Sequence, residues 1–273
     1  MKKDQYIIAC LESPATAELV LPFARQCAAR LNKGIIALNV SKDGNNEWLK
    51  QFGLPYIGLK GDWKTAIDGL PTAFGGVLAV TAVDTDADKQ SIANPTTLLK
   101  TFADCKIAYL IVGGKLSRDV DKQWPRVTFL TLDHRRESKE KLIWGSYMVR
   151  FFGSQLTVAT PDYKDGGFRE KVHNNILFMK KIYSSLNVNY NTWQFPLSTL
   201  AHPDIQLMRI DGVFNAEDSD NRLLIAMSTD KRDRDLGDII SGPPERKLLI
   251  AAANRSIPLM LINQRDDLYV LCD

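Results

Sequence analysis

The sequence predicts an α/β protein of two similar halves, each with a five-stranded, mainly parallel sheet and flanking helices. Two observations support this prediction. Short apolar runs of strand length alternate with longer segments whose apolar residues recur at helical spacing along most of the chain. The first strand–helix–strand pattern also recurs further along the chain at a constant offset, which favours a duplication.

The first pattern occupies residues 5–40. Residues 5–11 (QYIIACL) and 35–40 (IIALNV) are apolar runs that predict strands, and residues 15–31 predict a helix between them. A strand, helix and strand in such a short segment form a βαβ unit, whose strands are parallel and whose crossover is right-handed. Apolar positions four residues apart share one face of the helix. They are Leu19, Phe23, Cys27 and Leu31.

The same pattern returns over residues 127–161, each position standing 121 residues after its counterpart, without a gap. Residues 127–132 (VTFLTL) and 156–160 (LTVAT) predict strands, and residues 137–152 predict the helix. The acidic residue Glu12, which follows the first strand, maps onto Asp133. The helix positions Phe23, Cys27 and Leu31 map onto Trp144, Met148 and Phe152.

Each repeat continues with a further series of helices and strands. The pair Asn94-Pro95 indicates a helix start, because Asn caps amide groups and Pro fits the first helical position. The first half is expected to continue with strand 55–59, helix 62–70, strand 76–83, helix 95–105 and strand 106–112. The second half is expected to continue with helix 167–186, strand 188–195, helix 203–216, strand 221–227, a helix opened by GPPE (242–245) and ending near 254, and strand 257–263.

We therefore expect a first domain over residues 1–114, a linker over 115–125 and a second domain over 126–273. The segment 113–125 (GGKLSRDVDKQWP) is polar and ends in Pro, as domain boundaries tend to. The second half has 26 more residues than the first between its opening unit and the loop after its fourth strand. This longer half is the expected place for functional specialisation.

Composition excludes several classes of protein. With 35 Lys+Arg against 32 Asp+Glu, the net charge of +3 is too small for the basic face of a nucleic-acid-binding protein. The longest uncharged apolar stretch falls short of the ~18 residues of a membrane span. The four cysteines are scattered and form no CxxC pair, which is typical of buried thiols in a reducing compartment. We expect a cytoplasmic protein that binds neither nucleic acid nor membrane.

Familiar catalytic and metal-binding patterns are missing from the sequence. There is no GxGxxG after either first strand, no GxSxG and no HExxH, and Gly113-Gly114-Lys115 lacks the earlier glycine of a phosphate-binding P-loop. The histidines His134, His173 and His202 have no Cys or His partner at zinc-ligand spacing. His134 follows a strand, where it is either a site residue or, as we favour, a solvent-facing loop residue. We expect no catalytic residue and no metal.

Two such five-stranded units in series resemble a tandem universal stress protein (UspA-like). In the nucleotide-binding branch of that family, an Asp ends the first strand, and a loop of the form G-x2-G-x9-G-[S/T] follows the fourth. Asp133 stands at the acidic position of the second half. The three glycine positions of the loop are filled by Thr81, Asp84 and Asn94 in the first half. In the second half they are filled by Ser228, Lys231 and Ser241, and a one-residue shift restores only Gly242.

These replacements disfavour nucleotide binding, because a Cβ crowds the approach of phosphate to the backbone, and Asp84 adds negative charge. The resemblance therefore implies the branch that does not bind ATP: a non-catalytic stress-response or regulatory module without a cofactor. The alternative is a nucleotide-binding (ATP/AMP) sensor with weak ATPase activity. In that sensor Asp133 would contact the base or ribose, and Lys231 and Ser241 would contact phosphates.

The expected partner is an unidentified protein or a small ligand in the cleft between the halves. In the family the last strands of two domains often pair, and a tandem chain can make this pairing internally as a pseudo-dimer. The tail 264–273 (QRDDLYVLCD) alternates apolar and polar residues and is expected to add a strand. An exposed edge there would allow a homodimer.

Overall fold

The computed structural model describes residues 4–42, 44, 46–113, 124–134, 139–196, 221–227 and 244–263. The first half contains strands β1 (Tyr6–Cys10), β2 (Gly34–Ser41), β3 (Tyr56–Lys60), β4 (Gly76–Val83) and β5 (Ala108–Gly113). Its helices are α1 (Pro14–Leu31), the 3₁₀ helix η1 (Glu47–Phe52), α2 (Trp63–Asp68), α3 (Leu70–Ala73) and α4 (Pro95–Thr101). The second half contains strands β6 (Val127–Thr131), β7 (Gln155–Asp162), β8 (Asn191–Pro196), β9 (Arg222–Met227) and β10 (Leu259–Ile262). Its described helices are α5 (Lys139–Phe152), α6 (Gly166–Ser185) and α9 (Pro244–Asn254).

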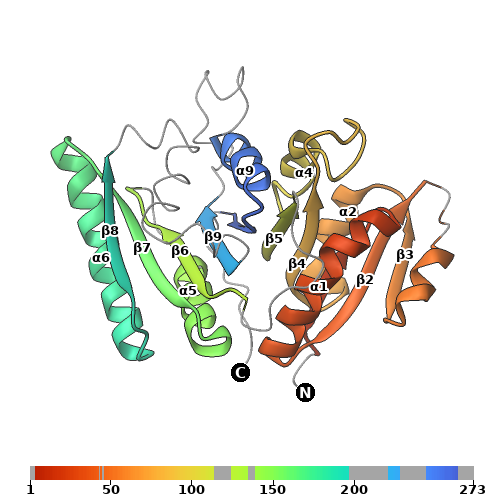
Figure 1. The fold of residues 1–273 in the computed structure, drawn as a ribbon, viewed down its shortest axis with the longest axis horizontal. Helices are drawn as coiled ribbons and strands as arrows, with labels where there is room; N and C mark the ends of the chain where they lie inside the picture. The colour runs from red at the N-terminus through yellow and green to blue at the C-terminus, as the bar shows by residue number, and fades with distance from the viewer. Residues whose placement is uncertain are drawn as a thin grey trace.

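All of these strands form one sheet in the order β3-β2-β1-β4-β5-β10-β9-β6-β7-β8 (Figure 1). The α/β class, the mainly parallel strands and the flanking helices confirm the prediction. The last strands of the two halves, β5 and β10, pair in antiparallel fashion and join the two five-stranded sheets into one continuous sheet, as the resemblance implied. This pairing satisfies the backbone groups that two separate sheets would leave exposed at their edges.

The register of the strands repeats with the offset seen in the sequence. Tyr6 pairs with Gly34 between β1 and β2, and Val127 pairs with Gln155 between β6 and β7, each residue 121 positions later. A row of paired residues crosses each half in the corresponding order. The rows are Ala9, Val80 and Leu110 in the first half and Leu130, Ile225 and Met260 in the second.

These rows make Leu110 and Met260 equivalent residues, and the two are also partners where β5 meets β10. A residue that pairs with its own counterpart marks a two-fold axis, as in the interface of a symmetric dimer. The two halves are therefore related by a pseudo-two-fold axis between β5 and β10.

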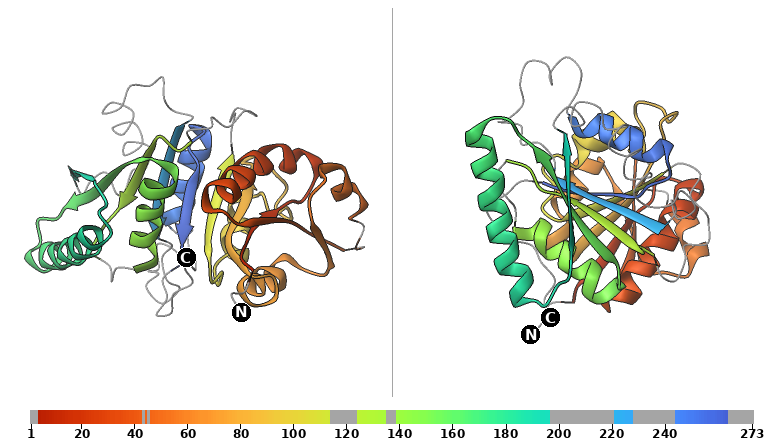
Figure 2. Two further views of the ribbon diagram at one scale, coloured as in Figure 1. Left: turned by 90° about the horizontal axis from the view of Figure 1, so that it is seen from below. Right: turned by 60° about the vertical axis from the view of Figure 1, so that its left-hand side comes forward.

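Helices cover both faces of the sheet because successive side chains of each strand point to opposite faces (Figure 2). Ile7 and Ala9 of β1 pack in the cluster beneath α1 and α5, whereas Ile8 and Cys10 pack in the cluster beneath α2, α4 and α9. The helices also meet across the pseudo-two-fold axis. On one face α1 contacts α5, and on the other α4 contacts α9.

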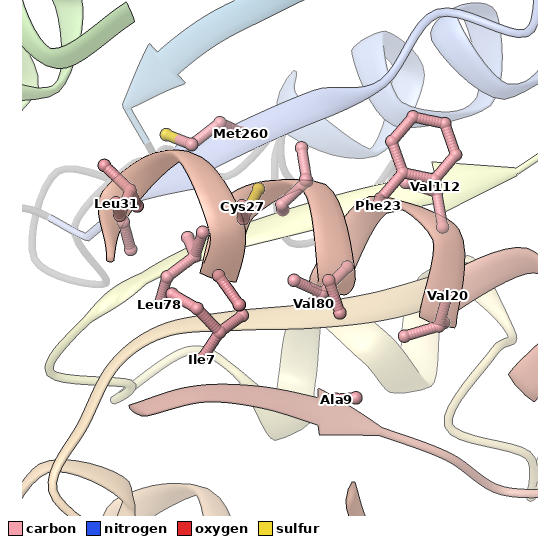
Figure 3. Packing of buried hydrophobic residues seen from close by; sticks show 14 of the residues in the cluster. Ile7, Ala9, Val20, Phe23, Cys27, Leu31, Leu78, Val80, Val112 and Met260 are labelled. Carbon is pink, nitrogen blue, oxygen red and sulfur yellow. The ribbon is translucent and has the colours of Figure 1, made fainter. Parts of the chain in front are cut away.

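The core on the α1 face extends across the junction between the halves. Figure 3 shows Phe23, Cys27 and Leu31 of α1 directed toward the strands, with Met260 of β10 nearby. Trp124, just before β6, is 1% exposed. Its ring meets Phe23 edge-on at 4.9 Å and Phe152 of α5 edge-on at 6.3 Å, so one side chain links the two helices.

Most predicted elements lie where expected, with shifts at their ends. β4 matches its predicted bounds, and the Asn94 side chain caps α4 as predicted, although α4 ends at Thr101 rather than at 105. The 3₁₀ helix η1 has no predicted counterpart. The predicted helix 203–216 and the predicted terminal strand in 264–273 lie outside the described residues. In the part that is described, no helix is both long and apolar enough to cross a membrane.

Candidate ligand site at the carboxyl ends of the strands

The order of the strands marks one crevice in each half where a ligand can bind. In an open α/β sheet, ligands bind outside the carboxyl ends of the strands, where consecutive connections leave in opposite directions. From β1 the chain proceeds to β2 on one side, whereas β4 joins β1 on the other; β7 and β9 flank β6 in the same way. The candidate sites therefore lie between β1 and β4 and between β6 and β9.

In the first half this position is occupied by the chain's own loop. Glu12 stands two residues after the end of β1, and its carboxylate accepts a hydrogen bond from the Ser91 hydroxyl. It also accepts one from the Ile92 backbone N–H at 3.3 Å. Ser91 and Ile92 belong to the loop from β4 to α4, so the residue at the acidic position of the first half holds this loop over the end of β1.

Internal hydrogen bonds hold the same loop in a compact form. The Asp84 N–H donates to the Ala93 carbonyl at 2.9 Å, and the Asn94 amide donates to the Ala87 carbonyl at 3.0 Å. The Asn94 side-chain oxygen accepts from the N–H groups of Thr96 and Thr97, at 3.1 and 3.4 Å. The first backbone donors of α4 are therefore already used by a side chain of the protein.

The loop positions assigned from the sequence fall differently on the strands. Thr81 lies inside β4, where it pairs with Ile111 of β5, rather than in the loop. By register, the second-half residue equivalent to Thr81 is Ala226 of β9, not Ser228. The first position of the G-x2-G-x9-G pattern was therefore placed within β4 in the first half, because the end of a buried apolar strand is not marked in the sequence.

In the second half the structure places one of the five predicted site residues. Asp133 lies half-buried after β6, and its backbone carbonyl accepts a hydrogen bond from the Asn175 side chain of α6 at 2.8 Å. The other four are Ser228, Lys231, Ser241 and Gly242, and they lie outside the described residues. Which of them approach Asp133 stays a prediction.

Sequence reasoning missed two buried charged residues, one of which reaches the carboxyl end of β6. Glu140 and Lys141, in the first turn of α5, are 2% and 1% exposed. The Lys141 ammonium donates a hydrogen bond to the backbone carbonyl of Thr131, the last residue of β6. Comparison of the two halves could have revealed these residues. At the offset of 121, Glu140 and Lys141 align with the apolar residues Leu19 and Val20 of the first half.

His134 belongs to an aromatic cluster rather than to an open loop. Its Nδ1 and the Tyr163 hydroxyl share a hydrogen bond of 2.6 Å. The ring of Phe168, at the start of α6, lies 4.4 Å from the His134 ring and is 39% exposed. His134 is thus a partly exposed residue in the bend after β6, and Tyr163 and Phe168 pack against its ring.

The three described cysteines are buried and form no disulfide, which agrees with the expected buried thiols. Burial raises the pKa of the Cys27 thiol to about 12. It raises the pKa of the Cys10 thiol further, with a smaller contribution from Cys105 nearby. These thiols are protonated at neutral pH and are poor nucleophiles. Among the described residues, no three His, Cys, Asp or Glu side chains are grouped so that they could hold a metal ion.

The topology and the position of the crevices define a doubly wound α/β protein with the fold of the universal stress proteins. A universal stress protein from Archaeoglobus fulgidus DSM 4304 superimposes with a TM-score of 0.62 at 11% identity, over 96% of this chain and 97% of that one. A functionally unknown protein from Pseudomonas aeruginosa PAO1 gives 0.56 at 10% identity, over 95% and 92%. The cytoplasmic domain of a prokaryotic cation chloride cotransporter gives 0.55 at 8% identity, over 95% of each chain.

At these identities the comparisons establish the fold alone. No protein-family profile matches the chain, and no curated protein sequence matches it significantly.

Proposed function

We propose that the protein is a non-catalytic regulatory module of the universal stress protein type, acting in the cytoplasm by binding a small ligand or a protein partner through its second half. The observation that carries this proposal is the difference between the two crevices. In the first half, Glu12 accepts hydrogen bonds from the loop residues Ser91 and Ile92, so the protein itself already engages this carboxylate. In the second half, the described residues at the equivalent place are Asp133, whose carbonyl accepts a hydrogen bond from Asn175 of α6, and His134, which shares one with Tyr163.

The chemistry of the first crevice supports the absence of a nucleotide there. A phosphate at the start of a helix needs backbone N–H donors that face it. At α4 these donors are taken by Asn94, and Pro95 at the first helical position has no N–H. The negatively charged Asp84 stands in the same loop and would repel phosphate.

The structural neighbours are compatible with a regulatory role. The fold recurs in the cytoplasmic domain of a cation chloride cotransporter, which is one part of a larger protein. The specialised residues of the second half, which include Asp133 and His134, are candidates for selecting the ligand or partner of this chain.

The proposal is tested by thermal unfolding of the full chain with Mg²⁺ and ATP, ADP or AMP. We expect no shift of the melting temperature up to millimolar nucleotide. A nucleotide present at 100 times its Kd would add about 2.7 kcal/mol. At ~2 °C per kcal/mol, this would raise the melting temperature of a chain of this size by about 5 °C.

The alternative nucleotide sensor has a distinct signature in the same experiment. It predicts a shift with ATP that Asp133→Ala and Lys231→Ala both abolish and that Ser241→Ala weakens. Glu12→Ala is the matched control, because it changes the acidic position of the first half only. A shift that follows this pattern would refute the non-nucleotide proposal.

A further inference from the structure

Helices α4 and α9 are equivalent elements of the two halves, and they contact each other across the pseudo-two-fold axis (Figure 1). Met260 of β10 stands 150 residues after its counterpart Leu110 of β5. The same offset places Leu99 of α4 onto Leu249 of α9, and both side chains are buried against the sheet. Positions in α4 and α9 can therefore be compared one by one.

Thr96 and Arg246 occupy equivalent positions by this offset, and they contact each other at the axis. Thr96 lies in the first turn of α4, and Arg246 lies in the first turn of α9. The Nε of Arg246 donates a hydrogen bond to the Thr96 hydroxyl at 3.0 Å. In a symmetric dimer, a residue at the two-fold axis meets its own copy. Here a threonine meets an arginine, so the contact depends on a difference between the halves.

A second unlike contact lies just beyond β10. The Asn263 side-chain amide donates hydrogen bonds to the carbonyls of Phe102 and Cys105 in the first half, at 2.7 and 2.9 Å. Its Oδ1 accepts one from the Tyr109 hydroxyl at 3.4 Å. The offset makes Asn263 equivalent to Gly113, which has no side chain to donate. Two first halves paired with each other would therefore bury these carbonyls without the amide donor, which is unfavourable.

Two second halves paired with each other would bring two arginines together. Arg246 of each half would lie where Thr96 now accepts its hydrogen bond, and close contact between like charges is unfavourable. The neighbouring Glu245 is 5% exposed and already has an interaction partner. A cation in the first turn also opposes the dipole of α9, so the stability of the helix does not explain Arg246.

We propose that Arg246 is a specificity-determining residue of the central interface and, with Asn263, restricts this interface to the pairing of unlike halves. First halves paired together lack the asparagine, and second halves paired together have two arginines. The interface thus selects its partner by an attractive contact in one pairing and a repulsive contact in another. A second copy of the chain cannot add a like half at this surface. This inference goes beyond the proposed function and does not depend on it.

The test creates the contact of two second halves within the full chain. Thr96→Arg places two arginines at the axis, and its thermal unfolding is compared with that of wild type. At low salt we expect a melting temperature about 4 °C below wild type. The deficit should fall by about half in ~1 M sodium chloride, because salt screens repulsion between partly exposed charges.

The exchanged variant Thr96→Arg/Arg246→Thr again has one arginine and one threonine at the axis, in reversed halves. It should melt within about 1 °C of wild type, because the two changes compensate each other. The unfavourable position of the arginine in the helix dipole only moves from α9 to α4. Thr96→Gln is the matched control for side-chain length without charge, and it should melt within about 2 °C of wild type.

Three results would overturn the inference. They are a Thr96→Arg variant as stable as wild type, a deficit that is equal in Thr96→Gln or unchanged by salt, and an exchanged variant no more stable than Thr96→Arg. If Thr96→Arg does not fold, a folded exchanged variant supports the inference and an unfolded one refutes it. None of these results affects the proposed function, which fails instead on a nucleotide-dependent shift that Asp133→Ala abolishes.

Discussion

The contact between Glu12 and the loop after β4 can be tested by removing the carboxylate. Glu12 accepts hydrogen bonds from the Ser91 hydroxyl and the Ile92 N–H, and the group is half-buried. A hydrogen bond to a charged group contributes about 1.5–3 kcal/mol. Taking the lower value for a partly solvated site, Glu12→Ala should lower the free energy of unfolding by about 3 kcal/mol. Glu12→Gln, which keeps an acceptor but no charge, should cost about 1 kcal/mol.

Urea denaturation of the full chain measures these losses, and a double-mutant cycle with Ser91→Ala isolates the pairwise term. We expect a coupling energy of about 1.5 kcal/mol between Glu12 and Ser91. Hydrogen exchange should also become faster at the Ile92 amide, while amides of β4 keep their protection. A Glu12→Ala variant within 0.5 kcal/mol of wild type, with unchanged exchange at Ile92, would refute the closed state of the first crevice.

Four further predictions concern the packing and the thiols. Trp124→Ala should cost about 4 kcal/mol in urea denaturation, because it removes a buried ring between α1 and α5, and a loss under 1 kcal/mol would contradict this packing. Asn263→Ala should lower the free energy of unfolding by about 2–4 kcal/mol in urea denaturation, because the Asn263 side-chain amide is the shared hydrogen-bond donor of two buried carbonyls. A variant as stable as wild type would contradict this role. Native protein in a Cys272→Ser background should resist alkylation at Cys27 at pH 8, because burial raises the pKa of this thiol to about 12 from 9.0. Rapid labelling of Cys27 would contradict its burial. Because its thiol must stay neutral in the fold, the contribution of Cys27 to stability should be complete below pH 9 and decline as the pH rises toward 12.

Local patterns in the sequence predicted the fold well. The first βαβ unit and its repeat are visible because helix and strand periods differ, and a gap-free offset keeps both in phase. The structure adds that the strand register follows the same offset, from Tyr6 paired with Gly34 to Val127 paired with Gln155. The Asn94 cap was also predictable, because it depends on neighbouring residues alone.

Features that depend on distant residues could not be predicted in the same way. The contact of Glu12 with Ser91 joins residues 79 positions apart, and no local pattern indicates it. The pairing of β5 with β10, which are separated by most of the second half, was expected only through the family resemblance, since no local pattern indicates it. The structure also corrects the placement of Thr81, since a continuous apolar strand does not show where it ends.

The candidate site was predicted in part. Asp133 follows from its position after β6, whereas Lys141 was overlooked because a lysine in a helix is usually a solvated residue. Comparison of the two halves is what identifies it, through Val20 at the same position of the first half. An internal repeat thus serves as a reference that a single domain does not offer.

The contrast between a closed first half and a ligand-binding second half is tested most directly by backbone amide chemical-shift mapping of the full chain. MgATP is titrated up to millimolar concentration. We expect MgATP to shift neither the Ile92 and Thr96 amides of the first crevice nor the Thr131–Asp133 amides of the second. Saturable shifts of Ile92 and Thr96, with none at Thr131–Asp133, would contradict the assignment of the binding half.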